Sequence, residues 1–420
     1  MNKSNIMQTD IAKATIFLTE HQSQVVAIDD ATARLLQENE ATKVTVSPSE
    51  GGWRLTPSGV VGTFQINGQR FVIQPKIGIP NVLALMDVET NAIKWLHDSF
   101  EYEQVADLLV AIIRLFVRSL DRAIVQGLRY DYVVHEESLS SIRGRVDFKK
   151  VLRRPGILLP VPCTFEEYTP NIRINQLLLR ALQLSVRIPD VPPSDHLRLK
   201  KLTTDFDEVS ITQNPIDWVD TWVPSRLERH FETPVRLAAL IIRNLAINHR
   251  GQGQQGTTFL IEMHALVEKF IEVRLRRFLP PGYSLHAQDK RWLDVDAKIQ
   301  LRPDIVIRKD KADVAVADIK YKSVDEIQKI NNADLYQVHT YASVLGLPRA
   351  TIISCIAGKP PTNGNLAGQV RRTGISINLV PIDLSVPINE IDSQLRTVCL
   401  QLVYNFDEPL LSKPMTSSYL

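Results

Sequence analysis

Hydrophobic and polar residues near the N-terminus alternate in short runs that favour β-strands. Candidate strands cover residues 43–46, 59–66 and 69–76. Asn67-Gly68 separates the second and third runs, and both residues tolerate positive φ, which predicts a tight hairpin. We therefore predict a β-rich domain over residues 1–88, built as a small barrel or sandwich. Such a domain serves either as a reader of nucleic acid or modified bases, or as a structural or partner-docking module.

After this region the spacing of apolar residues becomes that of helices, which predicts a mainly helical middle domain over residues 89–250. Residues 91–130 have a helical pattern, and the run 106–120 is apolar over much of its circumference, as in a buried or interface helix. Strand-like patterns broken by turns follow over 128–168, and this is also the most basic part of the chain. Residues 171–250 are again mostly helical, with a proline-rich break at 189–193. The glycine-rich run 251–256 is a predicted linker.

A third domain is predicted over residues 257–405, followed by a tail at 406–420. A helix is expected from Thr258 to Leu279. Two β-branched runs, 304–307 and 314–320, flank the polar turn 309–313 and predict two antiparallel strands. A helix over 334–342, strands over 350–356 and 376–381, and a helix over 388–403 complete the domain. The fold class is therefore α+β, with a mixed sheet flanked by helices at the C-terminal end.

Candidate chemistry lies at the ends of the two antiparallel strands. The predicted hairpin brings Asp304 near Asp318 and Lys320, and strand alternation places Asp318 and Lys320 on one face with Ile319 on the other. Mg²⁺ prefers carboxylate, water and phosphate oxygens, so this group suits metal-dependent phosphodiester hydrolysis. Lys320 would orient or activate the attacking water, and its pKa should fall near a metal. The alternative is an edge hairpin with solvated charges.

Three further residues extend this candidate site. Gln337 and Tyr341 are four positions apart on one helix, beside its apolar stripe, and would support the site or touch a phosphate. Glu268 lies near the edge of the buried side of its helix, where it is either solvated or an additional metal ligand. His264 precedes Glu268 by four positions, and a surface or capping role is favoured over a place in the site.

Composition narrows the class of protein. The 49 basic and 47 acidic residues nearly balance, so affinity for DNA should be modest and confined to local basic patches. Three cysteines without CxxC spacing exclude a cysteine zinc site and a disulfide framework and favour the reducing cytoplasm. No segment approaches the roughly 18 apolar residues of a membrane span, and no signal segment is apparent. There is no P-loop, so the chain is not expected to bind a nucleotide itself.

These motifs resemble the PD-(D/E)xK nuclease superfamily, and more closely the McrC family, the nuclease subunit of McrBC-type modification-dependent restriction systems. The resemblance covers roughly residues 50–400 and is most specific over 260–345. Its matching segments are 263–270, 302–304, 318–322, 334–337, the Gly-Arg segment 142–148 and the segment 165–175. Val267 precedes Glu268 where the family often has phenylalanine, and Ile319 stands where threonine is frequent; neither change removes a functional atom.

The resemblance implies an endonuclease that uses Mg²⁺, with two ions per site as one option, to cut double-stranded, 5-methylcytosine-modified DNA in defence against foreign DNA. It also implies a hexameric AAA+ GTPase partner that resembles McrB. Contact with that partner and stimulation of its hydrolysis would fall to the middle region, with Arg143 and Arg145 as candidates, because guanidinium groups match carboxylates and phosphates. A DNA-backbone patch or solvated charge is the alternative for these arginines. Two other functions stay open: a standalone repair nuclease, and a non-catalytic subunit that only activates the GTPase.

Overall fold

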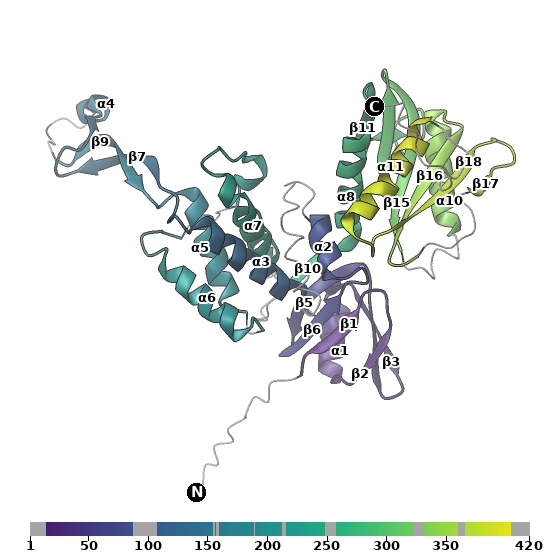
Figure 1. The fold of residues 1–420 in the computed structure, drawn as a ribbon, viewed down its shortest axis with the longest axis horizontal. Coiled ribbons are helices and arrows are strands. Elements are labelled where there is room, and N and C mark those ends of the chain that lie inside the picture. The colour runs from purple at the N-terminus through teal and green to yellow at the C-terminus, as the bar shows by residue number, and fades with distance from the viewer. Residues whose placement is uncertain are drawn as a thin grey trace, which may run out of the picture. The chain divides into compact units, whose positions relative to one another are not determined.

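A computed structural model of the chain describes residues 14–86, 107–153, 156, 159–188, 190–211, 216–247, 258–322, 331–359 and 366–404. These residues form two compact units, one of residues 1–108 with 260–420 and the other of residues 109–259. Residues 91–106 of the predicted helical stretch, the predicted linker 251–256 and the tail 406–420 lie outside the described residues. The first unit contains the strands and helices that carry the candidate catalytic residues (Figure 1).

The first part of this unit is a small two-sheet domain, which we call the N-terminal β domain. One sheet has the order β1-β6-β5-β10 and the other the order β2-β4-β3. The strands are β1 Ile16–Thr19, β2 Gln24–Val26, β3 Val44–Ser49, β4 Gly52–Pro57, β5 Val60–Ile66, β6 Gln69–Gln74 and β10 Phe259–Glu262. The helices α1 Asp30–Glu38 and α2 Ile79–Met86 and the 3-10 turn Glu40–Thr42 accompany them.

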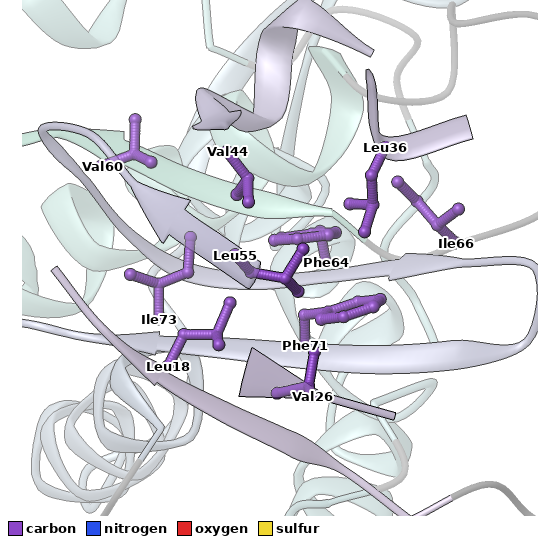
Figure 2. Packing of buried hydrophobic residues seen from close by; sticks show 10 residues of the cluster. All are labelled: Leu18, Val26, Leu36, Val44, Leu55, Val60, Phe64, Ile66, Phe71 and Ile73. Atoms are coloured by element: carbon purple, nitrogen blue, oxygen red, sulfur yellow. The ribbon is translucent and has the colours of Figure 1, made fainter. Parts of the chain in front are cut away.

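The apolar positions of both sheets meet in one core. Figure 2 shows Phe64 and Phe71 stacked, with ring centroids 4.9 Å apart, among aliphatic side chains of the two sheets and Leu36 of α1. The predicted hairpin is confirmed: Ile66 pairs with Gln69, and Asn67 and Gly68 have φ of 50° and 71°. Strands β5 and β6 are buried at nearly every position, and the turn that joins them is one that these two residues favour.

The prediction of a continuous helix from Thr258 to Leu279 was wrong at its start. Residues 259–262 form β10, which lies beside β5 in the N-terminal β domain, and helix α8 covers only Met263–Phe278. The Met263 N–H donates to the carbonyl of Gly59 at 2.9 Å, at the point where strand changes to helix. A short apolar run does not distinguish strand from helix by its pattern, and here pairing with a distant strand decides it.

The C-terminal part is a mixed six-stranded sheet of order β11-β14-β15-β16-β18-β17. Its strands are β11 Tyr283–Ala287, β14 Ile305–Lys309, β15 Ala312–Tyr321, β16 Arg349–Ile356, β17 Leu366–Gln369 and β18 Ser376–Asp383, and β12 Arg291–Trp292 with β13 Gln300–Leu301 makes a separate two-stranded ladder. Helices α8 and α11 (Ile388–Tyr404) pack on one face and α10 (Asn332–Leu345) on the other (Figure 1). The α+β class is therefore confirmed.

The β14–β15 hairpin, which carries the candidate catalytic residues, forms as predicted. Strands β14 and β15 are antiparallel, with Ile305 opposite Ala317, and the turn contains Asp310 and Lys311 at positive φ. β15 then pairs in parallel with β16, which buries it on both sides. Helix α10 begins at Asn331, whose side chain accepts from the Ala333 N–H, and ends at Gly346 with φ of 66°. These caps fix the two ends of the helix.

The second unit combines helices with a small antiparallel sheet of order β7-β9-β8. Its helices are α3 Leu108–Ala123, α4 Phe148–Leu152, α5 Arg173–Ser185, α6 Pro193–Thr204 and α7 Glu232–Ile247, its strands are β7 Asp131–Leu139, β8 Arg145–Val146 and β9 Val161–Thr169, and its 3-10 turns are Val219–Thr221 and Arg229–Phe231. Helix α3 is buried over most of its length, as its apolar pattern predicts. The side-chain amide of Asn175 donates to the carbonyls of Arg129 and Pro170, both at 2.7 Å, and ties α5 to the chain before it.

Cys163, Cys355 and Cys399 are each buried and free. None of the helices in the described ranges combines the length and apolar character that crossing a membrane requires.

Candidate active site

The candidate site starts at Asp304, directly before β14. Its Oδ2 accepts the backbone N–H of Ile319 on β15 at 2.8 Å, and its Oδ1 accepts the Nε2–H of Gln288, also at 2.8 Å. The Gln288 backbone N–H in turn donates to the Asp304 carbonyl at 3.1 Å. Gln288 carries no motif in the sequence, so pattern analysis missed it. Both carboxylate oxygens of Asp304 are therefore oriented by neighbours, with lone pairs left for a further ligand.

Asp318 and Lys320 lie together on the same face of β15. The Asp318 side chain is 2 % exposed, and Lys320 Nζ lies 2.7 Å from its Oδ2. Ile319, between them, is buried on the opposite face, as strand alternation requires. The structure thus brings three of the predicted residues, Asp304, Asp318 and Lys320, to one place.

Helix α10 fixes Lys320 from the side. Lys320 Nζ donates to Gln337 Oε1 at 3.1 Å, Gln337 Nε2 donates to the Tyr341 hydroxyl at 2.7 Å, and that hydroxyl donates to the Arg302 carbonyl at 3.4 Å. The four-residue spacing of Gln337 and Tyr341 is what allows them to bond along one helix face. Their arrangement here is a hydrogen-bonded chain that runs from Lys320 back to the segment before Asp304.

A third acid, Asp334, also approaches the lysine from the first turn of α10. Its Oδ1 lies 3.7 Å from Lys320 Nζ, and its Oδ2 is paired with Lys322. Lys320 is therefore surrounded by acids and an amide oxygen, which restricts the position of its ammonium group.

Glu268 on α8 lies close enough for its charge to interact with both aspartates. Burial, followed by the charges of Asp304 and Asp318, raises the pKa of Glu268 to about 7. His264 lies one turn before it, with Nε2 at 3.1 Å from Glu268 Oε1, and burial lowers the pKa of His264. His264, for which a surface or capping role is expected, has a half-exposed side chain and lies beside Glu268, because positions four apart share a helix face.

The acids repel one another. Burial and the charge of Asp304 raise the pKa of Asp318 to about 6, although Lys320 opposes that rise. Burial by itself lowers the pKa of Lys320, but the hydrogen bond and charge of Asp318, with Asp334 and Asp304, outweigh it and leave the pKa of Lys320 above its usual value. The three acids around the ammonium group thus raise this pKa in the chain by itself, and its fall near a metal stays a prediction.

The donor set suits a hard divalent cation. Asp304, Asp318 and Glu268 offer carboxylate oxygens, and a cation between them would offset the burial and the mutual repulsion that raise the pKa values of Asp318 and Glu268. Asp318 Oδ2 is buried and, beyond the ion pair with Lys320, accepts no hydrogen bond. Within the described ranges, no three His, Cys, Asp or Glu side chains make a ready-made metal cluster. Mg²⁺ commonly uses one or two carboxylates and keeps several waters.

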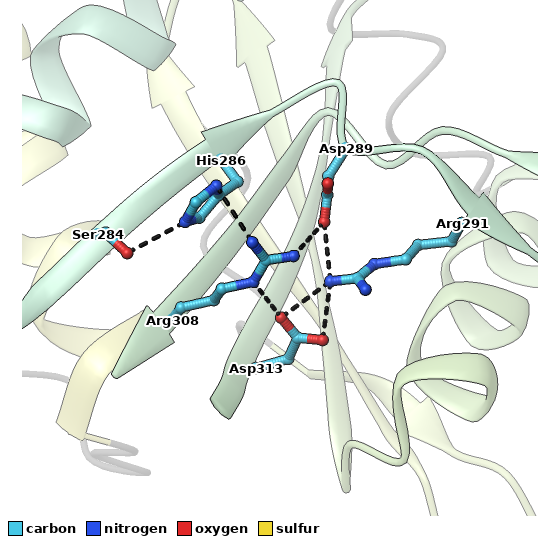
Figure 3. A network of polar contacts seen from close by, with 6 residues as sticks. All are labelled: Ser284, His286, Asp289, Arg291, Arg308 and Asp313. Carbon is cyan, nitrogen blue, oxygen red and sulfur yellow. Dashed lines mark hydrogen bonds and ion pairs between the residues drawn. The ribbon is translucent and has the colours of Figure 1, made fainter. Parts of the chain in front are cut away.

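A network of arginines and aspartates stabilises the far end of the hairpin (Figure 3). Arg308 on β14 bonds Asp313 at 2.8 Å and Asp289 at 2.7 Å, and Arg291 bonds the same two acids at 2.9 Å and 2.8 Å. The network lies where the β14–β15 register shifts, next to Arg308. It ties the segment that carries Gln288 to the strands that carry the acids.

Arg143 and Arg145 lie in the second unit, Arg145 on β8 of the small sheet and Arg143 in the loop just before it. Arg143 stacks over Phe165, with its guanidinium carbon 4.2 Å from the ring centroid, and pairs with Glu167 at 3.2 Å. Arg145 opposite Thr164 is exposed and has no ion pair within the described residues. Gly144 between them has φ of 67°, and a Cβ there would lie 2.4 Å from the Thr164 carbonyl oxygen, so only glycine fits.

These features define a class of α+β protein in which a group of acids and one lysine meet at a hairpin of a mixed sheet. The family described as "McrBC 5-methylcytosine restriction system component" matches residues 55–353. That match spans more than half of the chain, and the chain therefore belongs to this family. The family assignment made from the motifs is confirmed.

Solved structures add a likeness in fold. One chain of the refined half-complex from the tetradecameric assembly of Thermococcus gammatolerans McrB AAA+ hexamers with bound McrC has a TM-score of 0.64 and 18% identity, covering 91% of this chain and 99% of that chain. A chain of the cryo-EM structure of the Thermococcus gammatolerans McrBC complex has a TM-score of 0.45 and 20% identity, covering 63% of this chain and 88% of that chain. No curated protein matched the sequence.

Proposed function

We propose that this chain is the Mg²⁺-dependent DNA endonuclease subunit of a GTP-driven, modification-dependent restriction complex. The observation that carries the proposal is the convergence of Asp304, Asp318 and Lys320 on the β14–β15 hairpin, with Lys320 held by Gln337. This arrangement supports a PD-(D/E)xK core over the predicted domain 257–405. Membership of the McrBC family supports the restriction role.

The residues divide the chemistry among them. Asp304 and Asp318, with Glu268 in addition, would hold Mg²⁺, which when bound lowers the pKa of a coordinated water and offsets charge on the phosphate. Lys320 then orients the attacking water and stabilises the negative charge that builds on the phosphate oxygens. Gln337 keeps the ammonium group in place, and Tyr341 keeps Gln337 in place.

The partner is proposed from the family and the structural likeness. The similar assembly from Thermococcus gammatolerans contains McrB AAA+ hexamers with bound McrC. A net charge of +2 gives this chain little general attraction for DNA, which suits recruitment to DNA by a motor subunit. We place the contact with the partner on the second unit, whose small sheet exposes Tyr132, Val134 and Tyr168 and whose helix α4 exposes Phe148.

For stimulation of the partner's GTPase, the two candidate arginines differ. Arg143 is already paired and stacked within its sheet, so it stabilises the segment around Gly144. Arg145 is exposed and forms no ion pair with the described residues, so it is the better donor to a phosphate or to an acid of the partner. Arg145→Gln should lower stimulated GTP hydrolysis, whereas Arg229→Gln, at an exposed arginine of the same unit, should not. Equal stimulation by both variants would remove Arg145 from this role.

The experiment that tests the nuclease assignment is cleavage of modified plasmid DNA by this chain with its AAA+ GTPase, Mg²⁺ and GTP. Asp304→Asn keeps the shape of the side chain but removes its charge, and should reduce cleavage by about 10³-fold or more, the scale of losing a metal-binding and charge-stabilising group. Asp310→Asn is the matched control, because Asp310 lies exposed in the turn of the same hairpin at φ of 49°, which asparagine tolerates.

The two other functions make different predictions in the same assay. A standalone nuclease would cut without GTP or partner. A subunit that only activates the GTPase would support equal cleavage, or none, in the Asp304→Asn variant and the wild type, and catalysis would then belong elsewhere.

A further inference from the structure

The side chain of Tyr321, the residue after Lys320, contacts the N-terminal β domain and not the candidate site. Tyr321 is 7 % exposed, and its hydroxyl donates to Glu20 Oε2 at 2.8 Å across 301 positions of sequence. Strand alternation turns its side chain away from the face that carries Asp318 and Lys320. The last residue of β15 is therefore hydrogen-bonded to Glu20, the residue that follows β1.

Two further side chains pack around the Tyr321–Glu20 hydrogen bond. Lys76 Nζ lies 3.7 Å from the centroid of the Tyr321 ring, and the His21 ring meets the same ring edge-on at 6.3 Å. Glu20 is 1 % exposed, and burial raises its pKa to about 7 while Lys76 and Tyr321 oppose that rise. A carboxyl, a phenol and an ammonium group buried together in this way are costly unless their mutual contacts are kept.

A second connection reaches the other side of the candidate site. Strand β10 belongs to the sheet of the N-terminal β domain, and α8, which carries Glu268, begins at its end. Glu262 at this junction pairs with Lys43 at 2.7 Å, and the Met263 N–H bonds the carbonyl of Gly59. Both the strand that carries Lys320 and the helix that carries Glu268 are thus held by the same small domain.

We infer that the N-terminal β domain is part of the scaffold of the nuclease site, and that Tyr321 and Glu20 are positioning residues that fix the end of β15 behind Lys320. This inference rests on the proposed nuclease function for its consequence, but the fixing of β15 can be measured without DNA. Catalytic groups must be held within a fraction of an ångström, and a small displacement by a distant change slows reaction more than it weakens substrate binding.

The test uses the full chain and two readouts. The first is amide hydrogen exchange over residues 318–321 in the metal-free chain, where the Ile319 N–H reports on the bond to Asp304. The second is kcat and KM for modified plasmid in the reconstituted complex. Tyr321→Phe removes only the hydroxyl, Glu20→Ala removes its acceptor, and Glu20→Gln keeps an acceptor oxygen. Tyr283→Phe on β11 is the matched control, since its ring packs by Lys309 at the sheet edge.

We expect Tyr321→Phe and Glu20→Ala each to speed exchange over 318–321 by about tenfold and to lower kcat by about tenfold with KM unchanged, the scale of one lost buried hydrogen bond. Glu20→Gln should restore both readouts to within a few-fold of wild type, and Tyr283→Phe should alter neither. Wild-type exchange in both variants, or equally faster exchange throughout the chain, overturns the inference. A wild-type complex that does not cut DNA overturns the proposed function instead. Hydrogen exchange still shows whether Tyr321 and Glu20 fix the end of β15.

Discussion

Replacing Asp318 by asparagine should remove activity and at the same time make the metal-free chain more stable. Asp318 is buried beside Asp304, and its pKa is raised from 3.8 to about 6. The folded chain therefore disfavours the ionised carboxylate, and this cost is present in full above about pH 6. Asparagine resembles the protonated acid in shape and carries no charge, so it avoids that cost.

The size of the effect follows from the pKa. A rise of about two units corresponds to roughly 3 kcal/mol at pH 8, because each unit is about 1.4 kcal/mol. At pH 5 the folded chain holds the proton and the unfolded chain has lost it, so about half of this cost remains. The full figure is an upper limit, because the amide pairs less well with Lys320 than the carboxylate does.

Thermal unfolding in EDTA at pH 5 and pH 8 measures this difference. With about 2–4 °C per kcal/mol for a unit of this size, Asp318→Asn should raise Tm by up to roughly 6–12 °C at pH 8 and by about half as much at pH 5. An equal fall in Tm at both pH values would refute the reasoning, because it would mean that the carboxylate stabilises the metal-free fold.

Three further predictions concern the proposed metal ligands, Gln288 and Gly144. Mg²⁺ should raise Tm more at pH 8 than at pH 5.5, since Glu268 and Asp318, with pKa values of about 7 and about 6, must release protons to bind it; an equal rise at both pH values would speak against these ligands. Gln288→Ala should slow single-turnover cleavage by about tenfold, because Asp304 loses an oriented donor; an unchanged rate would show that the bond has no part in the reaction. Gly144→Ala should destabilise the small sheet by ~3 kcal/mol or more through the clash with the Thr164 carbonyl; wild-type hydrogen exchange in β8 and β9 would contradict it.

The local parts of the fold were predictable because neighbouring residues determine them. The Asn67-Gly68 turn and the β14–β15 hairpin both depend on pairing between adjacent runs, and both formed as expected. The polar turn that contains Asp310 brings Asp304 and Lys320 to one place without help from the rest of the chain. The helix over 334–342 was likewise foreseeable from its apolar stripe, and its caps fall just outside that stripe.

Contacts between distant segments were not predictable from one sequence. Strand β10 was expected to be helical, because its apolar run fits either structure until β5 is known to lie beside it. The bond between Tyr321 and Glu20 joins residues 301 positions apart, and no local pattern marks it. The raised pKa of Lys320 has the same origin, since it depends on Asp318 and on Asp334, which a separate helix contributes.

The central claim is that the acids and lysine of the β14–β15 hairpin cut DNA within a GTP-driven complex. Its most direct test compares wild type with Asp318→Ala in one reaction that contains modified plasmid, the AAA+ GTPase, Mg²⁺ and GTP, with DNA cleavage and GTP hydrolysis measured together. The account predicts that the variant stops cleavage and still stimulates GTP hydrolysis, because Asp318 and the proposed GTPase-activating residues lie in different units. Cleavage at the wild-type rate by the variant would contradict it and place the catalytic site elsewhere.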